Sequence, residues 1–163
     1  MIRICLHGAE STGKSTLAAR LGYPVVPEFG RAYCEERGTD LTMADLLAIA
    51  EGQDAAMRAA AAARPPVLVL DTDPVMTAAW AQMLFGEVPP ALLAYEKAEH
   101  YLLFMADVPW VDDGTRFFGS LTARAEFAAI ARSMLDRAGV DYDVICGDWQ
   151  TREAQVRAAI ARF

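Results

Sequence analysis

Residues 8–15, with the sequence Gly-Ala-Glu-Ser-Thr-Gly-Lys-Ser, combine the residue types that bind the phosphates of a nucleotide. Glycines let the backbone approach phosphate oxygens closely, and successive N–H groups can form an anion-binding concavity. Lys14 is expected to reach the β- and γ-phosphates, and the Ser15 hydroxyl to hold magnesium. A chance match in a chain of this length is roughly a one-in-two-hundred event. We therefore interpret residues 8–15 as a phosphate loop, with predicted nucleotide contacts at Gly8, Glu10, Ser11, Thr12, Gly13, Lys14, Ser15 and Thr16.

Two acids follow an unbroken apolar run at residues 67–70. The carboxylate of Asp71 is a candidate magnesium ligand, directly or through water. An aspartate also suits the N-cap of a helix, and Pro74 is well placed to open one. Asp73 fits the cap and a site role equally well.

A second cluster lies at residues 28–31, after an extended segment. Glu28 could accept the proton of a substrate hydroxyl or hold that hydroxyl in line for attack. Arg31 could bind the transferring phosphate or pair with an acid. A surface ion pair between the two residues explains the same spacing.

Residues 110–116, Trp-Val-Asp-Asp-Gly-Thr-Arg, have the composition of a lid over a site. Arg116 would neutralise the charge that develops on the γ-phosphate. The alternative is a solvated turn, because Asp-Gly is a common turn pair. Trp80, Trp110 and Trp149 could stack on aromatic rings, although a single tryptophan more often serves packing.

The elements that must position these residues alternate along the chain. Strands are predicted at residues 2–6, 23–27, 67–70, 101–105 and 141–146, and helices at residues 15–21, 42–63, 74–85, 122–138 and 151–162, with a further short helix opening at residues 89–90. This order predicts an α/β, three-layer fold with a mostly parallel five-stranded sheet and a lid loop. Ligands of such sheets bind outside the carboxyl ends of the strands, where the candidate acids fall.

Composition narrows the function classes. The 163 residues suit one domain over residues 1–163, and the net charge of −7 argues against a general nucleic-acid binder. No apolar run is long enough to cross a bilayer. Three cysteines form no CxxC pair, so we expect free thiols in a reducing cytoplasm, with Cys5 and Cys146 buried in strands. His7 and His100 have no metal-ligand spacing and are expected to be structural.

The chain resembles the nicotinamide riboside kinase domain of NadR-type NAD-biosynthesis proteins, an AAA-like ATP-binding domain of the P-loop kinase branch. The resemblance covers nearly the whole chain. It rests on four motifs in order: residues 8–15, residues 28–33 (Glu-Phe-Gly-Arg-Ala-Tyr), residues 70–73 (Leu-Asp-Thr-Asp), and residues 110–116 followed by Gly119-Ser120.

This resemblance implies a P-loop NTPase-type fold and an ATP- and Mg²⁺-dependent transfer to the 5′-hydroxyl of nicotinamide riboside, giving nicotinamide mononucleotide. Lys14 and Ser15 would then serve ATP and magnesium. Residues lining the phosphoryl-transfer region would be Glu28, Arg31, Asp71 and Asp73, with Arg116 in the lid. Which acid acts as the base stays open.

The cationic pyridinium ring of that substrate suits carboxylates and the faces of Trp80 and Trp110. Trp149 lies where P-loop kinases commonly hold the adenine. Members of the family often carry further domains before the kinase, and here the phosphate loop begins at residue 8. A stand-alone kinase-like domain is therefore expected, and its acceptor could be another nucleoside. A GTPase would carry an Asn-Lys-x-Asp motif, which is absent from the sequence. A non-catalytic nucleotide sensor remains an alternative.

Overall fold

A computed structural model describes residues 1–112, 114 and 116–163. In that part of the chain five parallel strands form one sheet in the order β2-β3-β1-β4-β5. The strands are β1 (Ile2–Gly8), β2 (Val25–Val26), β3 (Val67–Asp71), β4 (His100–Phe104) and β5 (Tyr142–Ile145). The predicted α/β class is confirmed, and every strand pairing is parallel.

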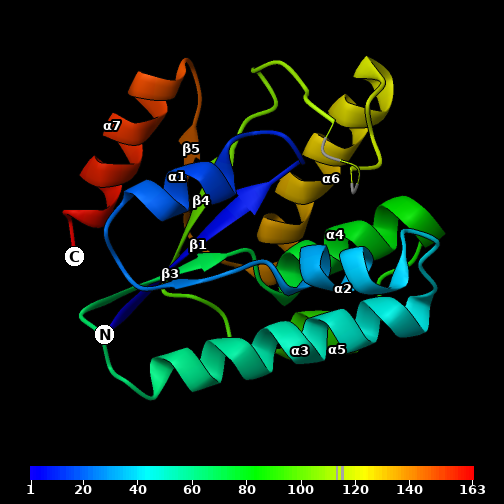
Figure 1. The fold of residues 1–163 in the computed structure, drawn as a ribbon, viewed down its shortest axis with the longest axis horizontal. Coiled ribbons are helices and arrows are strands. Elements are labelled where there is room, and N and C mark those ends of the chain that lie inside the picture. The colour runs from blue at the N-terminus through cyan, green and yellow to red at the C-terminus, as the bar shows by residue number, and fades with distance from the viewer. Residues whose placement is uncertain (113, 115) are drawn as a thin grey trace.

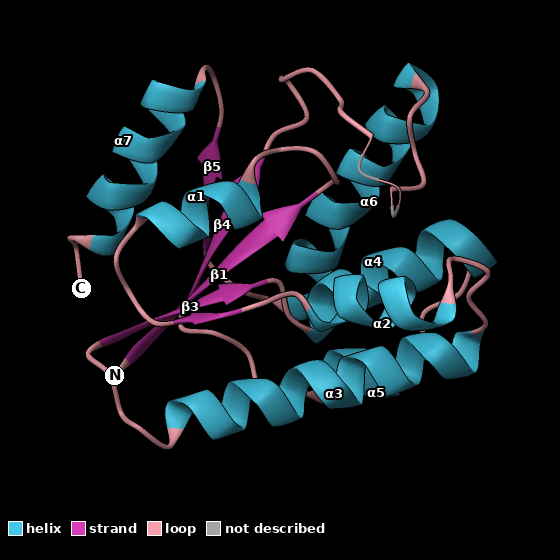
Figure 2. Ribbon diagram, viewed as in Figure 1, coloured by secondary structure: helices cyan, strands magenta, loops and turns pink. Residues whose placement is uncertain are grey.

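Helices cover both faces of this sheet, as Figures 1 and 2 show. They are α1 (Lys14–Arg20), α2 (Phe29–Arg37), α3 (Met43–Ala61), α4 (Pro74–Phe85), α5 (Pro90–Ala94), α6 (Leu121–Ala138) and α7 (Trp149–Ile160). Helices α1 and α7 pack on one face, whereas α3, α4 and α6 pack on the other. The three-layer arrangement follows from this division.

The alternation of side chains along β1 explains the two layers. Successive residues of a strand point to opposite faces of the sheet. Ile4 and Leu6 are fully buried against α1 and α7, whereas the intervening Cys5 is buried against the larger helical layer. Both faces of the central strands are thus covered, which accounts for their continuous apolar sequences.

Local chemistry accounts for where most helices begin. Thr42 and Asp45 form a reciprocal capping box at α3, and Pro74 stands in the first turn of α4. Ser120 caps α6 and Asp148 caps α7. These two helices therefore begin at Leu121 and Trp149, slightly earlier than predicted.

Two sequence-based expectations were incomplete or wrong. Helix α2 was not predicted, although it directly follows Glu28 and carries Arg31. Cys146 lies beyond β5 and is exposed rather than buried in a strand. All three cysteines are free thiols, as expected. Within the described residues, no helix is both long and apolar enough to span a bilayer.

The register of the sheet gathers the candidate residues at one edge. Leu6 is paired with Asp71, and Gly8 with Phe104. The segments that follow β1, β3 and β4 consequently leave the sheet side by side. The phosphate loop, the turn at residues 71–73 and the segment leading to α6 share this edge.

Candidate active site

The phosphate loop adopts a conformation that only small residues allow. Gly8 has a φ of 131°, and a Cβ atom there would lie 2.5 Å from the carbonyl oxygen of Phe104. Gly13, the N-cap of α1, has a φ of 84°. No described side chain caps α1 and its first turn holds no acid, in contrast to α3, α4, α6 and α7, which have side-chain caps. An uncapped helix N-terminus of this kind is suited to binding an anion.

Lys14 lies inside the phosphate loop. Its ammonium donates to the carbonyl oxygens of Gly8 and Ala9 at 2.9 and 2.8 Å. Burial lowers its pKa, and the nearby carboxylates of Glu28 and Asp71 oppose that shift. Lys14 is therefore a pre-positioned cation within electrostatic reach of both acids.

Asp71 ends β3 and is buried. Its Oδ1 atom has no hydrogen-bond partner among the described residues. The next residue, Thr72, has a φ of 75°, which is unusual for a β-branched residue, and it lines the cavity described below. A buried carboxylate oxygen without a partner at the carboxyl end of a central strand fits a cation ligand.

Glu28 stands at the N-cap position of α2, with its side chain free of any capping bond. Burial raises the pKa of its carboxyl, as does the charge of Asp71, whereas Lys14 and Arg31 lower it. Arg31 lies one turn on, with its Nη2 atom 3.5 Å from a Glu28 oxygen. The ion pair considered above is thus present, and both residues also line the cavity.

Gln53 of α3 holds the backbone on both sides of Glu28. Its Oε1 accepts from the N–H of Phe29 at 2.7 Å, and its Nε2 donates to the carbonyl of Pro27 at 3.3 Å. Gly52 makes room for the ring of Phe29, since a Cβ there would lie 2.4 Å from that ring. A buried amide thus fixes the peptide units that carry Glu28.

Asp73 is the N-cap of α4, the structural alternative considered above. Its Oδ1 accepts from the N–H of Val75 at 2.9 Å, and its Oδ2 accepts from the Tyr101 hydroxyl. The side chain is buried and does not line the cavity. Burial raises its pKa, and these hydrogen bonds lower it. Asp73 therefore braces the turn that presents Asp71.

The segment between β4 and α6 contacts the phosphate loop. Glu10 accepts from the N–H groups of Phe117 and Phe118 at 3.0 and 3.1 Å. The Ser11 hydroxyl accepts from the N–H of Val111 at 2.7 Å and from Arg116 at 3.2 Å. Of the predicted lid, Asp113 and Thr115 lie outside the described residues. Of the described lid residues, Val111 and Arg116 contact the loop directly.

One cavity joins the phosphate loop to an apolar compartment between α2, α3, α4 and α6. Its lining beside the phosphate loop includes Gly13, Lys14, Ser15, Glu28, Arg31 and Arg116. Its apolar lining includes Leu46, Ile49, Met76, Trp80, Phe117 and Phe127. Trp80 is stacked on Phe118 and contacts Phe117 and Phe127 edge-on or tilted. Trp110 does not line this cavity; its ring packs against Gly119.

Trp149 lies on the other side of the phosphate loop. Its ring covers Gly13, where a Cβ would lie 2.4 Å from the indole. It lines a second cavity together with Thr12, Thr16, Leu17, Arg20, Phe104, Arg152 and Glu153. The loop is thus flanked by two cavities, one on each side of Gly13.

Two buried arginines that sequence reasoning missed support the loop. Arg124 of α6 donates to the carbonyl oxygen of Ser11 at 3.3 Å, and Arg152 of α7 to that of Thr12 at 3.1 Å. In each helix the arginine lies on the same buried face as an apolar residue one turn later: Arg124 precedes Phe127 in α6, and Arg152 precedes Val156 in α7. That position on an apolar stripe is the signal that could have identified them.

Comparison with solved structures identifies the fold. NadR protein in complex with NR matches with a TM-score of 0.76 and 22% identity, over 98% of this chain and 51% of that one. This chain thus spans about half the length of that protein. Deoxyadenosine kinase from M. mycoides matches with a TM-score of 0.65 and 11% identity, over 99% of this chain and 100% of the kinase.

Thymidylate kinase from Ehrlichia chaffeensis matches with a TM-score of 0.71 and 11% identity, over 98% of both chains. A family model for the AAA domain matches residues 3–152, which include the phosphate loop, the acids and both supporting arginines. Such a domain implies nucleotide binding. The chain belongs to the AAA domain family and has the fold of the P-loop nucleoside and nucleotide kinases.

Proposed function

We propose that the protein is an ATP-dependent kinase for a small nucleoside-like acceptor, with nicotinamide riboside as the first candidate. The observation that carries this proposal is the single cavity that joins the phosphate loop, Glu28 with Arg31, and an aromatic compartment around Trp80. A donor site alone would serve a sensor or an ATPase. A second, apolar compartment beside it is what a kinase for a flat-ringed acceptor needs.

The proposed transfer assigns one role to each polar residue. Glu28 accepts the proton of the acceptor hydroxyl, whose oxygen then bonds to the γ-phosphorus. The bond from that phosphorus to the β–γ bridging oxygen breaks, and ADP leaves. Lys14 and Arg116 stabilise the charge on the phosphate oxygens, and Arg31 orients the transferring group. Asp73 enters as a positioning residue, through its cap on α4.

Magnesium is proposed to bind between Asp71 and Ser15. The Oδ1 of Asp71, which no described residue contacts by a hydrogen bond, and the exposed hydroxyl of Ser15 are oxygen ligands of the kind Mg²⁺ prefers. No group of three or more His, Cys, Asp or Glu side chains in the described part of the chain could hold a metal alone. When bound, magnesium would neutralise charge on the β- and γ-phosphates.

Several features support an aromatic acceptor with a positive charge. Trp80 offers a ring in the apolar compartment, and Glu28 lines the same cavity. A cationic ring is attracted both to aromatic faces and to carboxylates. The solved NadR protein, similar in fold, was crystallised with NR. A cytoplasmic location, where ATP is present, belongs to the same proposal.

The test is a substrate screen with purified protein, ATP and magnesium. Nicotinamide riboside, adenosine, cytidine and thymidine are supplied separately, with ADP release followed by a coupled assay and the product identified by mass. The Lys14→Met variant is the inactive control. We expect nicotinamide riboside to gain one phosphoryl group.

Two results would revise the proposal. Turnover of ordinary nucleosides without nicotinamide riboside would remove the substrate assignment and leave the kinase. Tight ATP binding with no turnover of any acceptor would favour a sensor, in which Asp71→Asn should leave the output largely intact.

A further inference from the structure

Glu10 belongs to the phosphate loop by sequence, yet its carboxylate is bonded to another part of the chain. Both of its oxygens lie 3.0 Å from the N–H nitrogen of Phe117, and one lies 3.1 Å from that of Phe118. A carboxylate is an acceptor-only group with two oxygens, so it can satisfy two neighbouring N–H groups at once. The phosphate loop thereby holds the backbone of residues 117–118.

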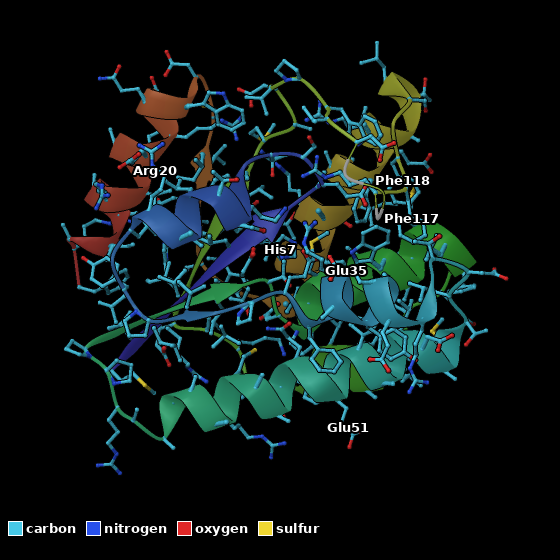
Figure 3. All side chains as sticks on the ribbon, viewed as in Figure 1. His7, Arg20, Glu35, Glu51, Phe117 and Phe118 are labelled. Atoms are coloured by element: carbon cyan, nitrogen blue, oxygen red, sulfur yellow. The ribbon has the colours of Figure 1, made fainter. Side chains whose placement is uncertain are left out.

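Phe117 lines the proposed acceptor compartment, and Phe118 packs on Trp80, which also lines it. Phe118 is stacked on Trp80 at a ring-centre distance of 5.4 Å, and Phe117 meets Trp80 edge-on at 5.0 Å. Phe118 also packs on Phe127 of α6 at 4.9 Å. Figure 3 shows Phe117 and Phe118 side by side close to α4 and α6. The Phe117 ring is part of the compartment wall, and the Phe118 ring contacts Trp80 and Phe127 of the same wall.

We propose that Glu10 is a positioning residue that connects the two halves of the site: it holds Phe117 and Phe118 against Trp80 and thereby sets affinity for the acceptor, rather than contacting the nucleotide. The part of this inference that concerns acceptor affinity rests on the proposed kinase function. The hydrogen bonds to the two phenylalanine N–H groups are independent of any activity.

The electrostatic setting of Glu10 favours this role. Burial raises the pKa of its carboxyl, whereas the N–H groups of Phe118 and Phe117 and the charges of Lys14 and Arg116 lower it. Glu10 lines the cavity beside Gly13 and Lys14, where an unpartnered carboxylate would repel the phosphates of a nucleotide. Its hydrogen bonds to the β4–α6 segment give that charge partners elsewhere.

The phosphate loop contacts the segment between β4 and α6 at more than one point. The Ser11 hydroxyl, bonded to Val111, adds a second contact between the same two segments.

The variants Glu10→Gln and Glu10→Ala test the proposal, with Glu51→Ala as a matched control. Glu51 is exposed on α3 and points away from the molecule in Figure 3. The first measurement is hydrogen exchange of the Phe117 and Phe118 amides by NMR. Charge-assisted hydrogen bonds of this kind predict about tenfold faster exchange or more in Glu10→Ala, an intermediate increase in Glu10→Gln, and no change in the control.

The second measurement compares the KM for the acceptor with the KM for ATP. We expect the acceptor KM to rise about tenfold in Glu10→Ala while the KM for ATP stays within about twofold. Unchanged exchange at both amides would overturn the proposal, and so would a rise in the KM for ATP with an unchanged acceptor KM. If wild-type protein turns over no acceptor, the kinase proposal fails, and the exchange data still decide whether Glu10 holds residues 117–118.

Discussion

The guanidinium of Arg152 donates to the carbonyl oxygen of Thr12 at 3.1 Å, so the first turn of α7 supports the phosphate loop. The same group donates to the carbonyls of Gly147 and Met105 at 2.7 and 3.0 Å and pairs with Asp107. One buried side chain therefore ties together the ends of β1, β4 and β5. We therefore expect the conformation of the phosphate loop to depend on Arg152.

Replacing Arg152 by Met is expected to destabilise the protein and weaken nucleotide binding. The change leaves several backbone carbonyl oxygens without their donor. Because Asp107 is partly exposed, we expect the free energy of unfolding to fall by only about 2–4 kcal/mol. Thermal unfolding should show a melting temperature lower by roughly 5–15 °C. Arg64→Met, at an exposed position after α3, is the control and should change little. Equal effects of the two substitutions would contradict the supporting role.

Replacing Asp71 by Asn is expected to impair the use of magnesium. The oxygen without a partner would lose its negative charge, so the magnesium concentration for half-maximal rate should rise at least about tenfold, with kcat reduced about a hundredfold. A magnesium titration of the initial rate measures both. Asp40→Asn, at an exposed position, is the control. An unchanged magnesium requirement would remove Asp71 from the metal site.

Replacing Glu28 by Gln is expected to abolish transfer and to raise stability. Because burial and Asp71 raise the pKa of Glu28, the folded protein holds that proton more tightly than the unfolded chain does. The free energy of unfolding therefore falls as pH rises through the interval between the two pKa values, and at neutral pH the ionised carboxylate still destabilises the folded protein. The variant should melt a few degrees higher, roughly 1–4 °C.

The pH profile of the wild type tests the same residue. If ionised Glu28 is the base, kcat/KM falls as pH drops through a pKa above the usual glutamate value of about 4.3. A profile that is flat through this range, or a variant that keeps wild-type activity, would exclude Glu28 as the base.

Replacing Trp80 by Leu is expected to weaken acceptor binding selectively. The substitution removes the stacked and edge-on contacts with the phenylalanines of the compartment. Lost aromatic contacts of this kind predict an acceptor KM about tenfold higher, with the KM for ATP nearly unchanged. Phe85→Leu, near the end of the same helix and exposed, controls for changes in α4. A matched rise in both KM values would indicate general unfolding of the site.

His7 is expected to make the fold sensitive to acid. It is fully buried, and burial lowers its pKa to about 4. The unfolded chain binds a proton near pH 6.5, so stability falls as pH drops from about 6.5 to about 4, by up to about 3 kcal/mol. Urea midpoints across this range measure the loss. His7→Phe should flatten that part of the profile, and an equally steep profile would assign the acid sensitivity to other groups.

Much of the fold follows from local patterns. The apolar run at residues 67–70, the glycines of the phosphate loop and the capping residue Thr42 each specify their element through nearby chemistry. Helix α2 was missed because its single buried residue, Cys34, creates no apolar stripe. Its position depends on a hydrogen bond from the N–H of Phe29 to the side chain of Gln53 in α3, which lies 24 residues further along the chain.

The residues of the candidate site that follow the ends of strands could be predicted from the sequence. Those that are positioned by long-range packing could not. The cavity lining includes Lys14, Glu28, Arg31 and Arg116, whereas Asp71, Asp73, Trp110 and Trp149 lie outside it. Gln53, Arg124 and Arg152 each lie on the buried face of a helix, in the middle of α3 and in the first turns of α6 and α7. Their partners are backbone carbonyl or N–H groups of distant loops, which no local pattern reveals.

The three tryptophans have a spectroscopic consequence. Trp80 lies in the acceptor compartment, Trp149 covers Gly13 of the phosphate loop, and Trp110 packs on Gly119 at the start of α6. The chain contains no other tryptophan. Variants that keep one indole at a time would give separate fluorescence signals from the acceptor compartment, the phosphate loop and the segment that joins them, so the order in which the two substrates bind could be followed by emission alone.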